Sequence, residues 1–313
     1  MRLDHLLAIV LLVTTSSNGS VAIVTPAPAS LVRLESVNHA FDMSFLRRAM
    51  LPPGSRPEAA LASVDLDIPP GAVLACCGDS GSGKSTLLAI LAQELEPSGG
   101  VVAFSPACRP HLVSDVEFKG LSGELKAAGS LETALAAERR PFLSDAARGK
   151  LLALFPDEMV RRSFEALPTA SQCAATAVLA LGRCFEQQQE EEEEEVESEG
   201  SEGIDNADGD DDNAEGDTGV LLRHPLLLMD ELLDGAGPSA WATAEQRVET
   251  DRVLRAACAS FGASIVYATH CDHHARLADR VLFFSRGAVK QDAPPDQSIY
   301  WKWKEEQQKA RQW

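Results

Sequence analysis

Basic residues are scarce in this chain of 313 residues, where 28 Lys and Arg stand against 47 Asp and Glu. The formal net charge of −19 is local in origin, because 17 acidic residues and no basic ones lie between Glu186 and Asp217. The rest of the chain holds 30 acidic and 28 basic residues and is nearly neutral. It therefore lacks the basic surface that nucleic-acid binders carry, and we expect no nucleic acid as a partner.

Cysteine pairs with metal-ligand spacing are also absent. The number of cysteines is odd and no Cys-x-x-Cys pair occurs; the seven are Cys76, Cys77, Cys108, Cys173, Cys184, Cys258 and Cys271. Because no disulfide framework or zinc motif is present, we expect reduced thiols that are mostly buried.

No apolar run reaches the length needed to span a bilayer. Eight apolar residues at positions 6–13 follow a short polar start and precede small residues that end at Ala22. This arrangement predicts a cleavable signal or targeting peptide at residues 1–22, although Asp4 offsets the charge of Arg2. A buried N-terminal segment is the alternative.

Strand and helix patterns alternate through the rest of the chain. Apolar and polar residues alternate as in half-exposed strands at 30–41 and 60–71, with a Pro/Gly-rich loop between them. The other predicted elements are buried or partly buried strands at 72–77, 226–231, 263–270 and 280–287, helices at 84–95, 172–185 and 243–259, and mostly helical segments over 120–167. Buried strands that alternate with helices indicate a parallel α/β core.

Residues 186–219 form an acidic segment of low complexity. They contain too few apolar residues to bury a core, so we expect a disordered insertion within the folded domain.

A phosphate-binding loop is the strongest motif in the chain. Gly78-x-x-x-x-Gly83-Lys84-Ser85 matches the P-loop pattern in full, with a buried strand before it and a helix after it. In such a loop, backbone N–H groups, the helix N-terminus and the lysine bind the phosphates, and the serine hydroxyl binds Mg²⁺. The predicted nucleotide-binding residues here are Gly78, Asp79, Ser80, Gly81, Ser82, Gly83, Lys84, Ser85 and Thr86.

An acidic pair follows the buried strand at 226–231. Asp230 is predicted to be a Mg²⁺ ligand together with Ser85, and Glu231 is predicted to activate the attacking water. The predicted cofactors are therefore ATP and Mg²⁺.

These motifs resemble those of the ATP-binding cassette (ABC) family over residues 31–290, followed by a polar tail at 291–313. The resemblance implies a P-loop NTPase fold with a RecA-like parallel core, an antiparallel β-subdomain and a helical subdomain. It places Phe41 against adenine and gives His270 the role of the switch histidine that contacts the γ-phosphate. It also implies a homo- or heterodimer through the nucleotide face, and a separate membrane subunit as a further possible partner.

His270 has competing interpretations. It stands among crowded ligand-type residues, and His270 and His274 have the i,i+4 spacing of a helical metal site. A zinc site would need a further ligand, whereas a Thr-His pair at the end of a strand is typical of the switch role. A purely structural role also remains open.

The opposing nucleotide face departs from the family pattern. Where the family has its Leu-Ser-Gly-Gly-Gln signature, the chain has Leu167 followed by Pro168, Thr169 and Ala170. No Gln occurs between Gln93 and Gln172, so the glutamine expected to line the site is missing. The Gly-Leu-Ser-Gly at 120–123 imitates the signature but comes too early in the chain. The usual Ser-x-Leu-Asp loop does not follow Glu231.

One nucleotide face is therefore intact and the other is degenerate. We expect an ABC-type nucleotide-binding domain that binds Mg·ATP and hydrolyses it slowly. The alternatives are an ATP-dependent interaction module without hydrolysis, and the ATPase subunit of a transporter whose membrane part is a separate chain. The compartment stays unassigned, because a leader indicates the secretory route or an organelle whereas ATP use favours the cytosol or an organelle interior.

Overall fold

The computed structural model describes residues 12–15, 21–24, 30–41, 59–136, 144–169, 171–184, 224–234 and 244–310. The predicted acidic insertion at 186–219 and most of the predicted leader lie outside the described residues. Within 1–24, strand β1 (Leu12–Thr15) pairs antiparallel with β2 (Val21–Val24).

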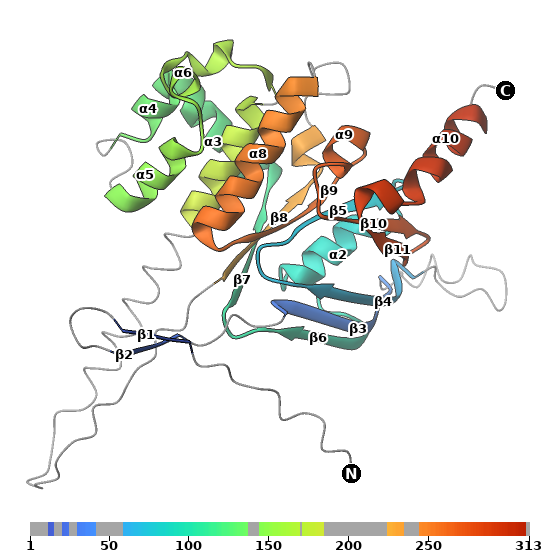
Figure 1. Ribbon diagram of the computed structural model, residues 1–313. Coiled ribbons are helices and arrows are strands. Elements are labelled where there is room, and N and C mark those ends of the chain that lie inside the picture. Colours follow the sequence, from blue (N-terminus) through green and yellow to red (C-terminus); the bar gives the residue numbers. More distant parts are fainter. Residues whose placement is uncertain are drawn as a thin grey trace, which may run out of the picture.

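A six-stranded sheet runs through the centre of the molecule (Figure 1). Its order is β11-β10-β5-β9-β8-β7, and every pair is parallel except β10 with β11. The strands are β5 (Val73–Gly78), β7 (Cys108–Val113), β8 (His224–Asp230), β9 (Ser264–Ala268), β10 (Arg280–Ser285) and β11 (Ala288–Ala293). The predicted parallel α/β core is confirmed. Since β5, β8 and β9 are adjacent and parallel, the residues that follow them meet at one edge.

A second sheet is antiparallel and has the order β4-β3-β6, with β3 (Val32–His39), β4 (Leu61–Ile68) and β6 (Gly99–Phe104). Helix α2 (Lys84–Leu91) lies between the two sheets in Figure 1. Its Leu87, Leu88 and Leu91 are fully buried and share one hydrophobic cluster with residues of both sheets. This packing fixes the helix that follows the phosphate-binding loop.

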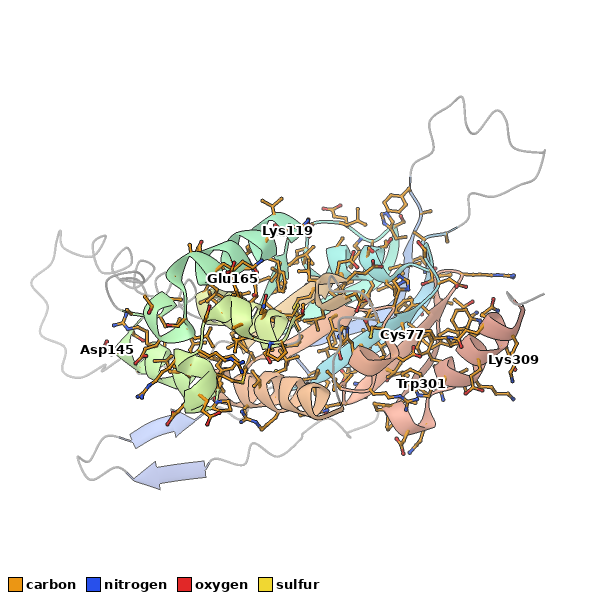
Figure 2. All side chains as sticks on the ribbon, turned by 90° about the horizontal axis from the view of Figure 1, so that it is seen from above. Cys77, Lys119, Asp145, Glu165, Trp301 and Lys309 are labelled. Carbon is orange, nitrogen blue, oxygen red and sulfur yellow. The ribbon has the colours of Figure 1, made fainter. Side chains whose placement is uncertain are left out.

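The opposite face of the central sheet is covered by helices. They include α3 (Asp115–Ala128), α4 (Leu131–Ala134), α5 (Asp145–Ala153), α6 (Asp157–Arg161), the 3₁₀ turn η1 (Phe164–Ala166), a helix over residues 171–184, α8 (Ala244–Phe261) and α9 (Asp272–Ala275). Figure 2 shows the α3–α6 end, marked by Lys119, Asp145 and Glu165, at the opposite side of the molecule from Trp301 and Lys309. The helices α3–α6 therefore form one end of the molecule, and the segment that contains Trp301 and Lys309 forms the other, the C-terminal end.

Both faces of β5 are buried. Val73, Ala75 and Cys77 pack in the helical cluster, whereas Leu74 and Cys76 pack in the cluster around α2. Burial raises the pKa of Cys76 to about 12, so its thiol stays protonated at neutral pH. All seven cysteines are free thiols and five are buried, in agreement with the expectation of reduced thiols.

Helix α10 (Tyr300–Ala310) was not predicted, because its sequence is polar apart from three aromatic residues. Tyr300 is 2% exposed, and Trp301 and Trp303 pack against the helical cluster. The segment assigned to a polar tail therefore contains a docked helix, preceded by the 3₁₀ turn η3 (Pro295–Gln297). Among the described helices, none combines the length and the hydropathy that crossing a membrane requires.

Candidate functional site

The phosphate-binding loop connects β5 to α2, as the motif predicts. Gly81 and Gly83 have positive φ angles of 75° and 107°, which glycine adopts without strain. A Cβ at Gly83 would lie 2.4 Å from the carbonyl oxygen of Ala60, so a side chain cannot be accommodated there. The first turn of α2 contains no acidic residue, so its N-terminal dipole is not offset by a carboxylate on the helix.

Lys84 is 4% exposed and its side chain turns into the loop. Its Nζ donates hydrogen bonds to the carbonyl oxygens of Gly78, at 3.2 Å, and Asp79, at 2.9 Å. A charged amine beside the N-terminus of a helix is an arrangement that binds phosphate groups.

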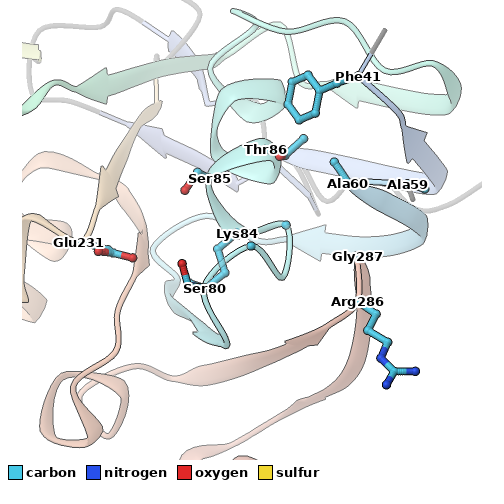
Figure 3. Close-up of a pocket in the computed structure, with 12 residues that line it drawn as sticks. Phe41, Ala59, Ala60, Ser80, Lys84, Ser85, Thr86, Glu231, Arg286 and Gly287 are labelled. Carbon is cyan, nitrogen blue, oxygen red and sulfur yellow. The ribbon is translucent and has the colours of Figure 1, made fainter. Parts of the chain in front are cut away.

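A cavity of about 340 Å³ opens beside this loop (Figure 3). Of the predicted site residues, it is lined by Phe41, Ser80, Gly81, Gly83, Lys84, Ser85, Thr86 and Glu231. Phe41 is 57% exposed and stands near Thr86, while Glu231 faces Ser85 and Ser80 from the other side. The cavity therefore offers an aromatic ring at one end and a carboxylate at the other. Gly78, Asp79, Ser82, Asp230 and His270 do not line it.

The turn between β10 and β11 supports the loop, which the sequence analysis missed. Gly287 N–H donates to Ser82 O at 3.0 Å, and Ala62 N–H donates to Gly287 O at 2.8 Å. With φ at 76° and Ala59 O only 2.7 Å from a Cβ position, Gly287 leaves no room for a side chain. The sequence could have indicated this turn, because Gly287 stands at the end of the strand predicted over 280–287.

Asp230 ends β8 and Glu231 follows it. Among the described residues, Asp230 Oδ1 is buried without a hydrogen-bond partner, although buried carboxylate oxygens normally have one. Together with the Ser85 hydroxyl this gives a set of hard oxygen donors, the kind that Mg²⁺ prefers. The residues present therefore fit a magnesium ion.

Glu231 and His270 meet at the carboxyl edge of the sheet. His270 Nε2 lies 2.7 Å from Glu231 Oε1, and both side chains are partly exposed. The contact arises because β8 and β9 are parallel neighbours and each residue follows its strand. The sequence predicted both residues but not their direct contact.

Asp234 is a further site residue that the sequence analysis missed. It lies in the 3₁₀ turn η2 (Leu232–Asp234) and accepts hydrogen bonds from Thr269 Oγ1, the N–H of His270 and His274 Nδ1, each at 2.6 Å. Burial alone would raise the pKa of Asp234, but the hydrogen bonds from His274, Thr269 and His270 lower it below its usual 3.8. An ionised carboxylate therefore fixes the start of the His270 loop.

The histidine cluster engages two separate carboxylates. His270 contacts Glu231, whereas His274 is fully buried and contacts Asp234. Asp234, Cys271 and His274 have ligand atoms within 4.8 Å of one another, a possible metal set. Since both Asp234 oxygens already accept hydrogen bonds from protein groups, the structure favours a hydrogen-bonded network at this position.

Replacing Asp234 with Asn is expected to destabilise the protein by about 2 kcal/mol, within the range for hydrogen bonds to charged groups. Because the folded-state pKa of Asp234 is depressed, its stabilisation is present above the unfolded-state pKa and is lost as pH falls through the folded-state value. Urea unfolding from pH 7 downward should show the gap between wild type and variant narrowing below pH 3.8. A gap that does not change with pH would exclude the charge as its source.

The degenerate signature lies at the start of the helix over residues 171–184. Gln172 N–H donates to Pro168 O at 3.0 Å, so Pro168 caps this helix; Ala170 lies outside the described residues. A second cavity of about 430 Å³ separates this helix from α3, with Thr169, Asp230 and Glu231 in its wall. The Gly-Leu-Ser-Gly at 120–123 lies inside α3 and does not form a loop.

Comparison with known proteins agrees with this geometry. The family described as ABC transporter matches residues 61–125, which contain β4, β5, the phosphate-binding loop and α2. Over these residues the chain is similar to the ATP-binding domains of the ABC transporter family. A Streptomyces coelicolor protein whose assigned name is ABC transporter ATP-binding protein SCO2324 is 30% identical over 246 residues, 75% of this chain. Protein STAR1 of Oryza sativa subsp. japonica is 52% identical over 48 residues, 15% of this chain.

The chain spans only 35% and 14% of the lengths of these two relatives. Among solved structures, a dimeric post-hydrolysis state of the ATP-binding cassette MJ0796 with ADP and Pi has 17% identity and a TM-score of 0.45, covering 84% of this chain and 98% of that one. The structure of cbiO1 from Clostridium perfringens has 16% identity and a TM-score of 0.47, covering 86% of this chain and 90% of that one.

Proposed function

We propose that this ABC domain binds Mg·ATP in the cavity of about 340 Å³ and hydrolyses it slowly. The proposal is carried by one observation: Lys84 and the open helix N-terminus lie in the same cavity wall as Glu231, which contacts His270. Phe41 would stack on adenine, and the loop residues 78–86 would surround the phosphates.

Ser85 and Asp230 would hold the magnesium ion, which neutralises charge on the phosphates when bound. Glu231 would accept a proton from water as the water oxygen attacks the γ-phosphorus and the bond to the ADP oxygen breaks. His270 would contact the γ-phosphate from its place beside Glu231, whose Oε1 lies 2.7 Å from His270 Nε2. Asp234 would orient His270 through the backbone N–H.

Slow turnover is expected because the opposing nucleotide face, which carries the degenerate signature, is impaired. In a head-to-tail dimer, the start of the helix over 171–184 would face the partner's γ-phosphate. Pro168 has no N–H to offer, and Thr169 and Ala170 replace glycines that would allow close backbone approach.

Phosphate release by the full chain tests this proposal. We expect low turnover in wild type, and a rise that depends on protein concentration when Pro168→Ser, Thr169→Gly and Ala170→Gly are combined, because the repaired peptide acts across a dimer. Bound ATP with no turnover in either protein would support the alternative, a nucleotide-dependent interaction module.

A second candidate is the ATPase subunit of a transporter with a separate membrane chain, supported by the similarity to the ABC transporter family and to the Streptomyces coelicolor ABC transporter ATP-binding protein. Co-purification with a membrane protein would support it. The leader at 1–22 and the compartment remain predictions that sequencing of the mature N-terminus tests.

A further inference from the structure

Helix α10 is firmly docked at the C-terminal end of the molecule, beside β10 and β11 (Figure 1). The Tyr300 ring lies 5.8 Å from that of Phe283, and the Trp303 ring lies 5.2 Å from it. The Trp301 indole N–H donates to Pro295 O at 2.5 Å. These contacts give the helix a fixed orientation relative to the central sheet.

From this position α10 reaches the loop that carries His270. Lys304 Nζ donates a hydrogen bond to the carbonyl oxygen of His270 at 2.9 Å, and it forms an ion pair with Asp272. The side chain of Lys304 is 25% exposed, so this ion pair is only partly screened by water. Arg276 adds a second link, with its guanidinium carbon 4.1 Å from the centre of the Trp301 ring.

His270 is thereby held from both sides of its backbone. Its N–H donates to Asp234, which is anchored beside β8, and its carbonyl accepts from Lys304. With both backbone groups fixed, the ring has little freedom besides its side-chain torsions, and Nε2 lies at 2.7 Å from Glu231.

We propose that Lys304 is a positioning residue for ATP hydrolysis, which clamps the His270 backbone so that the imidazole stays against Glu231 and the γ-phosphate. This inference rests on the proposed function, because it assigns His270 to the reaction. Lys304 does not touch the nucleotide cavity, so the effect of losing it falls on the chemical step and not on binding.

The experiment compares the full-length wild type with Lys304→Met, Lys304→Arg and Lys302→Met, the last being a matched control on the exposed side of the same helix. Lys304→Met is expected to lower kcat about tenfold, because that is roughly the effect on a rate of losing the free energy of one hydrogen bond from a charged donor. KM should change less than about twofold. Lys304→Arg keeps the charge and donors and should recover most of the rate. A loss of similar size in Lys302→Met would overturn the proposal.

A double-mutant cycle separates positioning from a general structural effect. If Lys304 acts through His270, Lys304→Met should lower kcat no further in a His270→Ala background. An equal further loss in that background would overturn the proposal.

Failure of the proposed function can be told apart from failure of this inference. If wild type and Lys302→Met show no hydrolysis, the nucleotide-free His270 imidazole NMR resonance, identified by its disappearance in His270→Ala, still reports the clamp. It should move in Lys304→Met and stay unchanged in Lys302→Met. An unchanged resonance in Lys304→Met would overturn the positioning role whatever the activity.

Discussion

Replacing Lys84 with alanine is expected to weaken Mg·ATP binding at least about 100-fold, since hydrogen bonds from a charged donor contribute about 1.5–3 kcal/mol each and every 1.4 kcal/mol is tenfold in affinity. The amine is almost completely buried at the helix N-terminus, where no other described lysine or arginine except Arg286 lines the cavity. In Figure 3 the Arg286 side chain points away from Lys84, so it does not replace the lost charge. Titration with a fluorescent ATP analogue measures the change.

The variant also loses the hydrogen bonds from Lys84 to the carbonyls of Gly78 and Asp79. Thermal unfolding therefore accompanies the titration, and Lys290→Ala, at an exposed position on β11, serves as the control for a lost lysine. Equal nucleotide affinity in wild type and a folded Lys84→Ala protein would disprove the phosphate-binding role of the loop.

The phosphate-binding loop could be predicted from the sequence because its requirements are local. Glycines at fixed spacing, a buried strand before them and a helix after them define the geometry within about a dozen residues. That β5, β8 and β9 are buried strands of a parallel sheet followed from their apolar runs, which a parallel sheet buried on both faces produces. Their order in the sheet is given by the structure. Asp230, Glu231 and His270 could each be placed at the end of a predicted buried strand, whereas their meeting at one edge follows from the pairing of β8 with β9.

The parts that failed prediction depend on contacts distant in sequence. Strand β7 reads Cys-Arg-Pro-His-Leu-Val and has no strand pattern, yet it pairs with β8 at the edge of the sheet. Helix α10 is polar in sequence, and it is held in place because its three aromatic residues pack against the hydrophobic cluster around Phe283. Tertiary packing overrides weak local preference in both cases.

Asp234 was missed for a different reason. In the family pattern the acidic residue belongs to a Ser-x-Leu-Asp loop after Glu231, and this chain lacks that loop. Asp234, three residues after Glu231, was therefore not recognised as a site residue. Its role follows only from the fold, which brings the turn after β8 against Thr269 and the N–H of His270 after β9. The clamp on His270 is thus assembled from three chain segments, around residues 234, 270 and 304.

Replacing Glu231 with Gln is expected to preserve Mg·ATP binding and to lower the wild-type hydrolysis rate about 10²–10⁴-fold, the usual contribution of a general base. The amide keeps the size of the side chain and can still contact His270 Nε2, but it cannot accept a proton from water. Single-turnover hydrolysis of radiolabelled ATP measures the rate at saturating protein, where a change in affinity does not contribute.

A matched control is Glu305→Gln, which makes the same change at an exposed position of α10 and should leave the rate unaltered. Because turnover in wild type is expected to be slow, a further decrease in rate is hard to measure. Glu231→Gln is therefore also made in the variant with Pro168→Ser, Thr169→Gly and Ala170→Gly, whose hydrolysis rate is expected to be higher. In that background Glu231→Gln should return the rate to the baseline of the Lys84→Ala protein. Fast hydrolysis that survives Glu231→Gln would show that another group activates water, and would remove the contact between Glu231 and His270 from the mechanism.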